Sequence, residues 1–213
     1  MRNKHPEYRT SPKERLSYWT FFVGQNVFYN MVAMFLSTYL AMQGISLAKA
    51  AAVLLAVKIW DAVNDPLFGF FFDRIQFKNG QKCLPWLRFV TAAIPIVTIG
   101  LFAIPRGLSE NAKLWWLCIF YILWDTAYTL TDVPVYSMLT TMTDNLHERT
   151  HLLSVNRVFS GAGVLIYGVV LNLLISEGVG MSATWAVAVL SVFSAVTMVP
   201  LCVNCREHIR PEY

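Results

Sequence analysis

Six long apolar stretches constrain this chain more than any other feature of its sequence. Each is about as long as the roughly 20 residues that a helix needs to cross a bilayer core about 30 Å thick. Only short segments join them, and 56% of all residues are hydrophobic against 14% charged. We therefore predict an all-α integral membrane protein with six transmembrane helices, at residues 16–40, 47–72, 84–104, 114–139, 152–176 and 183–203.

These helices divide the chain into a leader, a membrane bundle and a tail. The polar, basic start of the chain is not followed by the short apolar core and small-residue cleavage pattern of a removed signal peptide. We expect residues 1–15 to be a cytoplasmic leader and residues 16–203 to be the six-helix bundle. Residues 204–213 would then form a cytoplasmic tail that begins a central loop.

The placement of Lys and Arg predicts the orientation of the bundle. If both termini are cytoplasmic, 13 of the 17 basic residues fall in inner segments, and only Lys49, Arg106 and Lys113 fall in outer loops. Basic residues are retained on the cytoplasmic side of a membrane. We expect a multi-pass protein of the cell membrane that contacts lipid. Its positive charge is dispersed over short loops and forms no face for nucleic acid.

Charged residues lie in the middle of the second apolar stretch. A charge at the bilayer centre costs about 2.5–3.5 kcal/mol even on the lenient insertion scale, so such groups face the bundle interior and mark a pathway. Lys58, Asp61 and Asp65 have the i, i+3, i+7 spacing of one helix face, and Asn64 lies beside them. Two carboxylates and an amide oxygen form the hard, oxygen-rich environment that an alkali cation or a proton prefers.

The fourth stretch repeats this arrangement. Asp125, Thr129, Asp132 and Tyr136 follow one another at i, i+4, i+7 and i+11, a stripe that cannot face lipid. Arg157, near the start of the fifth stretch, would be a partner for these acids, as would the hydroxyls of a polar solute. The alternative is that the acids form internal salt bridges that only hold the bundle together, although buried pairs contribute little to stability.

The first stretch carries two neighbouring amides, Gln25 and Asn26, with aromatic side chains nearby. Amides beside aromatic rings are typical of sugar sites. Amides in membrane helices also form interhelical hydrogen bonds that serve packing alone. The residues themselves leave both interpretations open.

Four segments carry a resemblance to a known family. They are KIWDAVNDPLFGFFFDR at residues 58–74, GQKCLPW at 80–86, YILWDTAYTLTDVPVYS at 121–137 and ERTHLLSVNR at 148–157. In this order they resemble the second helix, the loop after it, the fourth helix and the following cytoplasmic segment of the glycoside-pentoside-hexuronide cation symporters. That family belongs to the major facilitator superfamily, and the melibiose permease is a member.

The resemblance implies roles for individual residues. Asp61, Asn64, Asp65 and Thr129 match the positions that bind the coupling sodium ion or proton. The family's sugar site is matched by Asp132 and Arg157, with Tyr128 nearby. The full expected substrate-binding set is Asn26, Gln25, Lys58, Tyr128, Asp132, Tyr136 and Arg157. Where the melibiose permease has a lysine, an acid and a tryptophan, this chain has Gln25, Asn26 and Tyr136, so the resemblance does not extend to galactoside specificity.

The resemblance covers only the amino-terminal half of such a transporter. Members have twelve helices in two halves and transport by alternating access to a solute held between the halves. We therefore expect this chain to be the amino-terminal half of a sodium- or proton-coupled sugar or glycoside symporter. It would need a carboxyl-terminal six-helix half as its partner, and no catalytic activity, cofactor or metal beyond the coupling cation is expected.

One motif favours a different class of protein. His147, Glu148 and His151 match the HExxH pattern of zinc proteases, in which two histidines one turn apart bind zinc and the glutamate activates water. Such a site needs a third ligand and a cavity. The motif falls in a short predicted cytoplasmic loop, far from Glu177 at the opposite face. Because the motif lacks a convincing third ligand, we keep a membrane-embedded zinc hydrolase as the alternative function and not as the main one.

Overall fold

The computed structural model describes residues 8–75, 77 and 80–209, and nearly all of them are helical. The first helical rod is continuous and consists of α1 (Pro12–Asn30), the π-helical turn η1 (Met31–Phe35) and α2 (Leu36–Met42). Five further rods follow, α3 (Leu47–Arg74), α4 (Leu84–Leu101), α5 (Glu110–Met142), α6 (Leu146–Ile175) and α7 (Ala183–Asn204). The described residues thus form one rod for each of the six predicted stretches, and the all-α fold is confirmed.

Local sequence signals fix where the rods begin and end. Ser11 precedes α1 and forms a capping box with Glu14, in which each side chain bonds the other's backbone N–H. Asn145 caps α6 with its side chain alone, which accepts from the backbone N–H groups of His147 and Glu148. Gly44 ends the first rod in the left-handed region, at φ 71°, where a residue with a Cβ would be strained.

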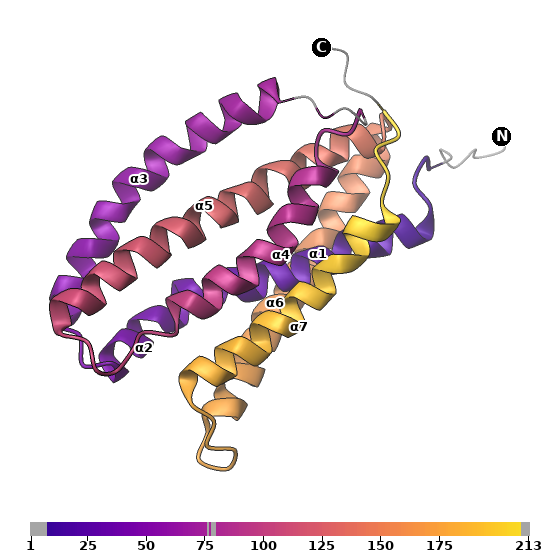
Figure 1. The fold of residues 1–213 in the computed structure, drawn as a ribbon. Coiled ribbons are helices and arrows are strands. Elements are labelled where there is room, and N and C mark those ends of the chain that lie inside the picture. Colours follow the sequence, from indigo (N-terminus) through magenta and orange to yellow (C-terminus); the bar gives the residue numbers. More distant parts are fainter. Residues whose placement is uncertain (1–7, 76, 78–79, 210–213) are drawn as a thin grey trace, which may run out of the picture.

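The rods pack in a fixed neighbour pattern. α1 lies against α6 and α7, α4 lies between α5 and α7, and α3 packs chiefly against α5 at the edge of the bundle (Figure 1). Large apolar side chains such as Leu55, Ile96, Trp185 and Val203 remain exposed on the outside. An outer surface of this kind suits a lipid environment rather than water.

Three helices among the described residues, α4, α6 and α7, are long and apolar enough to cross a membrane. α3 and α5 are less apolar because of the polar residues in their middle, namely Lys58, Asp61 and Asp65 on α3 and Asp125 and Asp132 on α5. These two rods therefore carry the charged residues that are predicted to mark the pathway.

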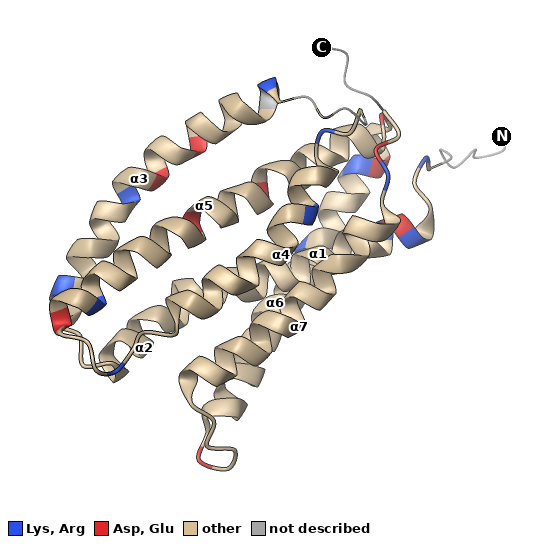
Figure 2. Ribbon diagram, in the orientation of Figure 1, with Lys and Arg blue, Asp and Glu red and all other residues tan. Residues whose placement is uncertain are grey.

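Both ends of the described chain lie at the same end of the bundle. His208 Nε2 is 2.8 Å from the Glu14 carboxylate, so the tail after α7 meets the start of α1. Figure 2 shows that most Lys and Arg positions gather at this end, while acidic positions occur in the middle of α3 and α5. The basic residues that predict the orientation are thus gathered mostly at one end of the folded bundle.

Small residues let α1 approach its neighbours closely. A Cβ at Gly24 would lie 2.3 Å from the Ser194 carbonyl oxygen on α7, and one at Gly163 of α6 would lie 2.6 Å from the Val23 carbonyl oxygen. Contacts of small residues are a common way for membrane helices to associate, since lipid provides no hydrophobic drive between them.

We expect Gly163→Ala to lower the free energy of unfolding by about 1–3 kcal/mol, the usual cost of overpacking. The added Cβ would collide with backbone, which cannot rotate away. Gly161→Ala is the matched control, because nothing lies within 4 Å of a Cβ there. Unfolding of the detergent-solubilised protein measures both, and equal stability of the two variants would contradict the packing described.

Candidate functional site

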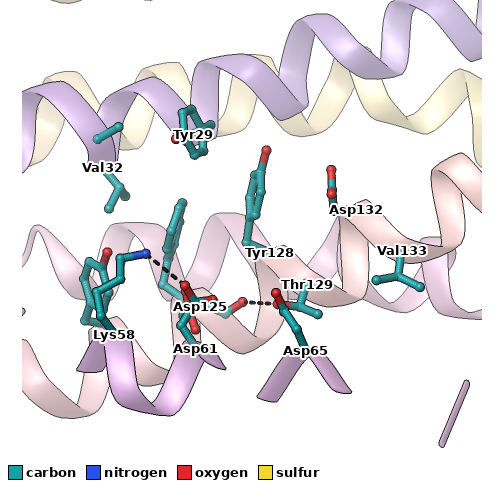
Figure 3. A pocket seen from close by; sticks show the side chains of 13 residues that line it. Tyr29, Val32, Lys58, Asp61, Asp65, Asp125, Tyr128, Thr129, Asp132 and Val133 are labelled. Carbon is teal, nitrogen blue, oxygen red and sulfur yellow. Dashed lines mark hydrogen bonds and ion pairs between the residues drawn. The ribbon is translucent and has the colours of Figure 1, made fainter. Parts of the chain in front are cut away.

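A cavity of about 450 Å³ lies between α1, α3 and α5. Its lining combines acidic, aromatic and hydroxyl side chains from these helices, several of which Figure 3 shows in sticks. The lining residues are Tyr29, Val32, Ala33, Lys58, Asp61, Asp65, Tyr121, Trp124, Asp125, Tyr128, Thr129, Asp132 and Val133. Cavities with a few convergent polar groups are the usual form of a small-molecule site.

α3 supplies the charged wall of the cavity. Lys58, Asp61 and Asp65 all line it, as their spacing on one helix face predicts. The Lys58 ammonium donates to Asp61 Oδ2 at 3.0 Å, so this cation already neutralises one of the two carboxylates.

Three of the four residues of the predicted cation site are joined by hydrogen bonds between α3 and α5. Asn64 Nδ2 donates to Thr129 Oγ1 at 3.1 Å, and Thr129 Oγ1 donates to Asp65 Oδ1 at 2.9 Å. Asn64 and Thr129 are both buried. Asp61, the fourth residue, lines the same cavity one turn before Asp65. The site thus offers carboxylate, amide and hydroxyl oxygens, the ligand set of a hard monovalent cation.

The predicted substrate-binding residues are only partly brought together. Gln25 Nε2 of α1 donates to Asp132 Oδ1 at 2.8 Å, which links the first and fourth predicted stretches across the bundle. Asp132 and Tyr128 line the cavity with Lys58. The ring of Tyr128 lies 5.5 Å from that of Tyr29, centroid to centroid.

Gln25 itself does not line the cavity, and the other three predicted substrate residues also lie outside its lining. Asn26 donates from its Nδ2 to the Phe22 carbonyl of its own helix at 2.9 Å. Tyr136 packs against the ring of Phe22 at 5.5 Å, and Arg157 is exposed on α6.

Sequence reasoning placed Asp125 on the inward stripe but in neither expected binding site, and it assigned no role to two other lining residues of α5, Tyr121 and Trp124. The signal was present for Asp125, because it lies on the same stripe as Thr129 and Asp132. Tyr121 lies one turn before Asp125, so it shares that face. Trp124 lacks such a signal, since tryptophan is as common on lipid-facing surfaces as on inner ones.

The HExxH motif has a structural use in the folded chain. Glu148 is fully buried and accepts hydrogen bonds from the backbone N–H groups of Arg9 and Thr10, both at 3.1 Å. The hydroxyls of Thr10 and Thr143 also donate to it, the latter at 2.6 Å. A carboxylate so fully bonded holds the segment before α1 against α6 and has no lone pair left to activate water.

The two histidines of the motif are also engaged elsewhere. The Tyr8 ring stacks on those of His147 and His151, with centroids 6.4 and 5.8 Å apart. Within the part of the chain that the structure describes, no cluster of three or more His, Cys, Asp or Glu side chains is arranged to hold a metal. The third ligand that a zinc hydrolase requires is not found among these residues.

Comparison with known proteins adds an independent finding. The model of a family described as MFS/sugar transport protein matches residues 18–212. Over 95% of its length the chain is 26% identical to the uncharacterized symporter YjmB of Bacillus subtilis, of which it covers 45%. It is also 26% identical to the isoprimeverose transporter of Lactiplantibacillus pentosus, over 92% of this chain and 42% of that protein.

A further match covers a smaller part of the chain, and that relative is named for a lipid and not for a sugar. Over 43% of this chain it is 34% identical to the sodium-dependent lysophosphatidylcholine symporter 1 of Xenopus tropicalis, of which it covers 17%. The chain therefore spans less than half the length of each of these relatives.

Glu148 gives a test of the end-of-bundle network. Burial alone would raise the pKa of this carboxyl, but the hydrogen bonds from Thr10 and Thr143 outweigh it and hold the pKa below the ordinary value of 4.5. The stabilisation it provides is therefore present in full above pH 4.5 and is lost as the pH falls through the lowered pKa.

We expect Glu148→Gln to destabilise the chain by about 1–3 kcal/mol at pH 7, because buried donors lose a charged acceptor. The difference from the wild type should shrink in acid. Glu177→Gln, at an exposed loop position, is the control and should have little effect. Thermal unfolding from pH 7 to well below pH 4.5 provides the measurement, and a difference that does not change with pH over this range would refute the assignment.

Proposed function

The chain belongs to the MFS/sugar transport protein family, and on that premise we propose that it is the amino-terminal half of a cation-coupled symporter for a sugar or glycoside. Members of this family transport solutes, so the chain is a membrane transporter and not an enzyme. The proposal rests above all on the hydrogen-bonded group Asn64, Thr129 and Asp65, which borders the same cavity as Asp132.

The cation is assigned to the oxygens of Asp61, Asn64, Asp65 and Thr129. In the structure the Lys58 ammonium is bonded to Asp61. A sodium ion or proton can bind at Asp65 beside this ion pair, or it can take the place of the ammonium at Asp61. Either way the positive charge of the coupling ion offsets carboxylates that are costly inside a membrane. This gives the cation a physical reason to bind at this depth.

The sugar is assigned to the other side of the cavity, around Asp132 and Tyr128. A carboxylate accepts hydrogen bonds from two neighbouring hydroxyls of a sugar, and a tyrosine ring packs against its apolar face. Gln25, which bonds Asp132, acts as a positioning group. Asn26, Tyr136 and Arg157 complete this site in our proposal, after a rearrangement that brings them to the cavity.

Transport requires a second wall. Since the relatives are more than twice as long as the matched region, we propose that a carboxyl-terminal six-helix half covers the open side of the cavity. Alternating access then consists of rocking of one half against the other around a site near the bilayer midplane.

Two classes of variant test this assignment in the assembled transporter. Asp65→Asn should weaken cation binding by about 10- to 100-fold, because a charge-assisted ligand contributes about 1.5–3 kcal/mol. Asp132→Asn should weaken sugar binding by a similar factor. Linkage requires the sugar and the cation to change each other's affinity by the same factor. Sugar binding is measured against sodium concentration and pH.

The two classes must separate for the proposal to stand. Asp132→Asn should leave cation affinity in the absence of sugar nearly as in the wild type, whereas Asp65→Asn should shift cation stimulation to cation concentrations about 10- to 100-fold higher. Full cation stimulation in an Asp61→Asn, Asp65→Asn double variant would exclude the cation site proposed.

The orientation is a further proposal, supported by the basic end of the bundle in Figure 2. In a variant without the native cysteines, a cysteine at Glu177 should react with an impermeant reagent added to intact cells. A cysteine at Gln81 should react only after permeabilisation. The reverse pattern would place both termini outside.

A further inference from the structure

The cavity holds four carboxylates but one ammonium. Among its lining residues, Asp61, Asp65, Asp125 and Asp132 are acidic, and Lys58 alone is basic. A single coupling cation would leave this wall of the cavity negative. A further positive group is therefore favoured there, because uncompensated charge is costly to bury.

Three of the four carboxylates have a polar partner. Asp61 is bonded by the Lys58 ammonium, Asp65 by the Thr129 hydroxyl and Asp132 by the Gln25 amide. The cation and sugar sites proposed above use these three. The fourth carboxylate remains without an assignment.

Asp125 is that carboxylate. Only 7% of its surface is exposed, and among the described residues its Oδ2 atom has no hydrogen-bond partner. The neighbouring Trp124 is buried too, and its indole Nε1 also lacks a partner in the described part of the chain. An unpaired acceptor and an unpaired donor thus occur on two consecutive residues of α5 that line one cavity; Figure 3 shows Asp125 in this lining. Buried polar atoms in native structures normally have partners, so this pair points to a ligand.

Aromatic rings line the same cavity next to Trp124. The Trp124 ring stacks on that of Tyr128 at 5.2 Å, and Tyr121 lies 6.0 Å from Trp124, centroid to centroid. Tyr29 of α1 adds a fourth ring from across the cavity, 5.5 Å from Tyr128. Ring faces attract organic cations, most strongly when both are shielded from water.

We propose that Asp125 and the rings beside it form a subsite for a positively charged amine on the transported solute. The substrate class is then an amino sugar, or a glycoside that bears an ammonium group. Asp125 accepts from the ammonium, the rings of Trp124 and Tyr128 face it, and the Trp124 indole donates to a hydroxyl of the same molecule. This inference rests on the proposed function and narrows it.

An amine fits this subsite better than a second metal ion. A sodium ion needs several oxygen ligands, whereas Tyr121, Trp124 and Tyr128, which line the cavity on the same helix as Asp125, present aromatic rings. An ammonium has three donors and needs only one carboxylate when aromatic faces surround it. Lys58, which would repel the amine, is held by Asp61.

Matched sugars test the proposal on the assembled transporter in lipid nanodiscs. Glucosamine and galactosamine are compared with glucose and galactose, and their N-acetyl forms serve as uncharged controls of similar size. We expect each amino sugar to bind about tenfold more tightly than its parent sugar, which corresponds to about 1.4 kcal/mol. The N-acetyl forms should show no such preference.

The variants identify the residues responsible. Asp125→Asn should reduce the amine-to-parent affinity ratio from about ten to about one, and Trp124→Leu should lower it as a second, independent variant. Asp65→Asn should weaken cation stimulation but keep the amine-to-parent affinity ratio, which separates the amine subsite from the cation site. Thermal unfolding confirms that each variant is folded.

Each outcome decides one of the two proposals. Cation-stimulated binding of neutral sugars with no amine preference, or a preference that survives Asp125→Asn, would overturn the amine subsite while the symporter function stands. Absence of binding of every sugar at all sodium concentrations and pH values would overturn the proposed function and this inference together.

Discussion

The Thr129 hydroxyl joins α3 to α5, and the remainder of the site depends on this junction. It accepts a hydrogen bond from Asn64 and donates one to Asp65, so a single side chain of α5 fixes two residues of α3. α3 is the edge rod and packs chiefly against α5 (Figure 1). A carboxylate that faces lipid is costly, so the charged face of α3 is oriented toward the bundle. The hydrogen bonds to Thr129 hold the helix in that orientation.

A second polar network secures the end of the bundle that holds both termini. Glu148 binds the segment before α1, and Glu207 accepts from the backbone N–H groups of Cys83 and Leu84, both at 2.9 Å, at the start of α4. An acid at a helix amino terminus satisfies unpaired donors and complements the helix dipole. The bundle is thus tied firmly at one end, while its polar middle is left open as a cavity.

Much of this could be predicted from the sequence because membrane helices leave few choices. The spacing of Lys58, Asp61 and Asp65 on one face is a property of any α-helix, and the cost of buried charge turns that face inward. The rods lie where the apolar stretches predict them, although α5 begins at Glu110 and α6 at Leu146, before the predicted stretches at 114 and 152. These predictions needed no knowledge of how the helices pack.

The details of the substrate side depend on packing, so the sequence could not supply them. Gln25 and Asn26 are adjacent but differ by about 100° around α1, and only Gln25 reaches Asp132. The aromatic lining of Tyr121 and Trp124 was missed for a related reason. Aromatic residues occur on inner and lipid-facing surfaces alike, and only the helix contacts show which ones border the cavity.

The most direct test of a cation site between α3 and α5 is chemical labelling of its carboxylates with a hydrophobic carbodiimide, mapped by mass spectrometry. The geometry predicts that Asp61 or Asp65 reacts in the lipid-embedded protein and that the coupling cation, sodium or proton, changes the extent of labelling. Labelling of Asp144, which pairs with Arg9 at the exposed end of the bundle, should not respond to sodium. No reaction at Asp61 and Asp65, or a reaction insensitive to both sodium and pH, would contradict a cation site at this junction.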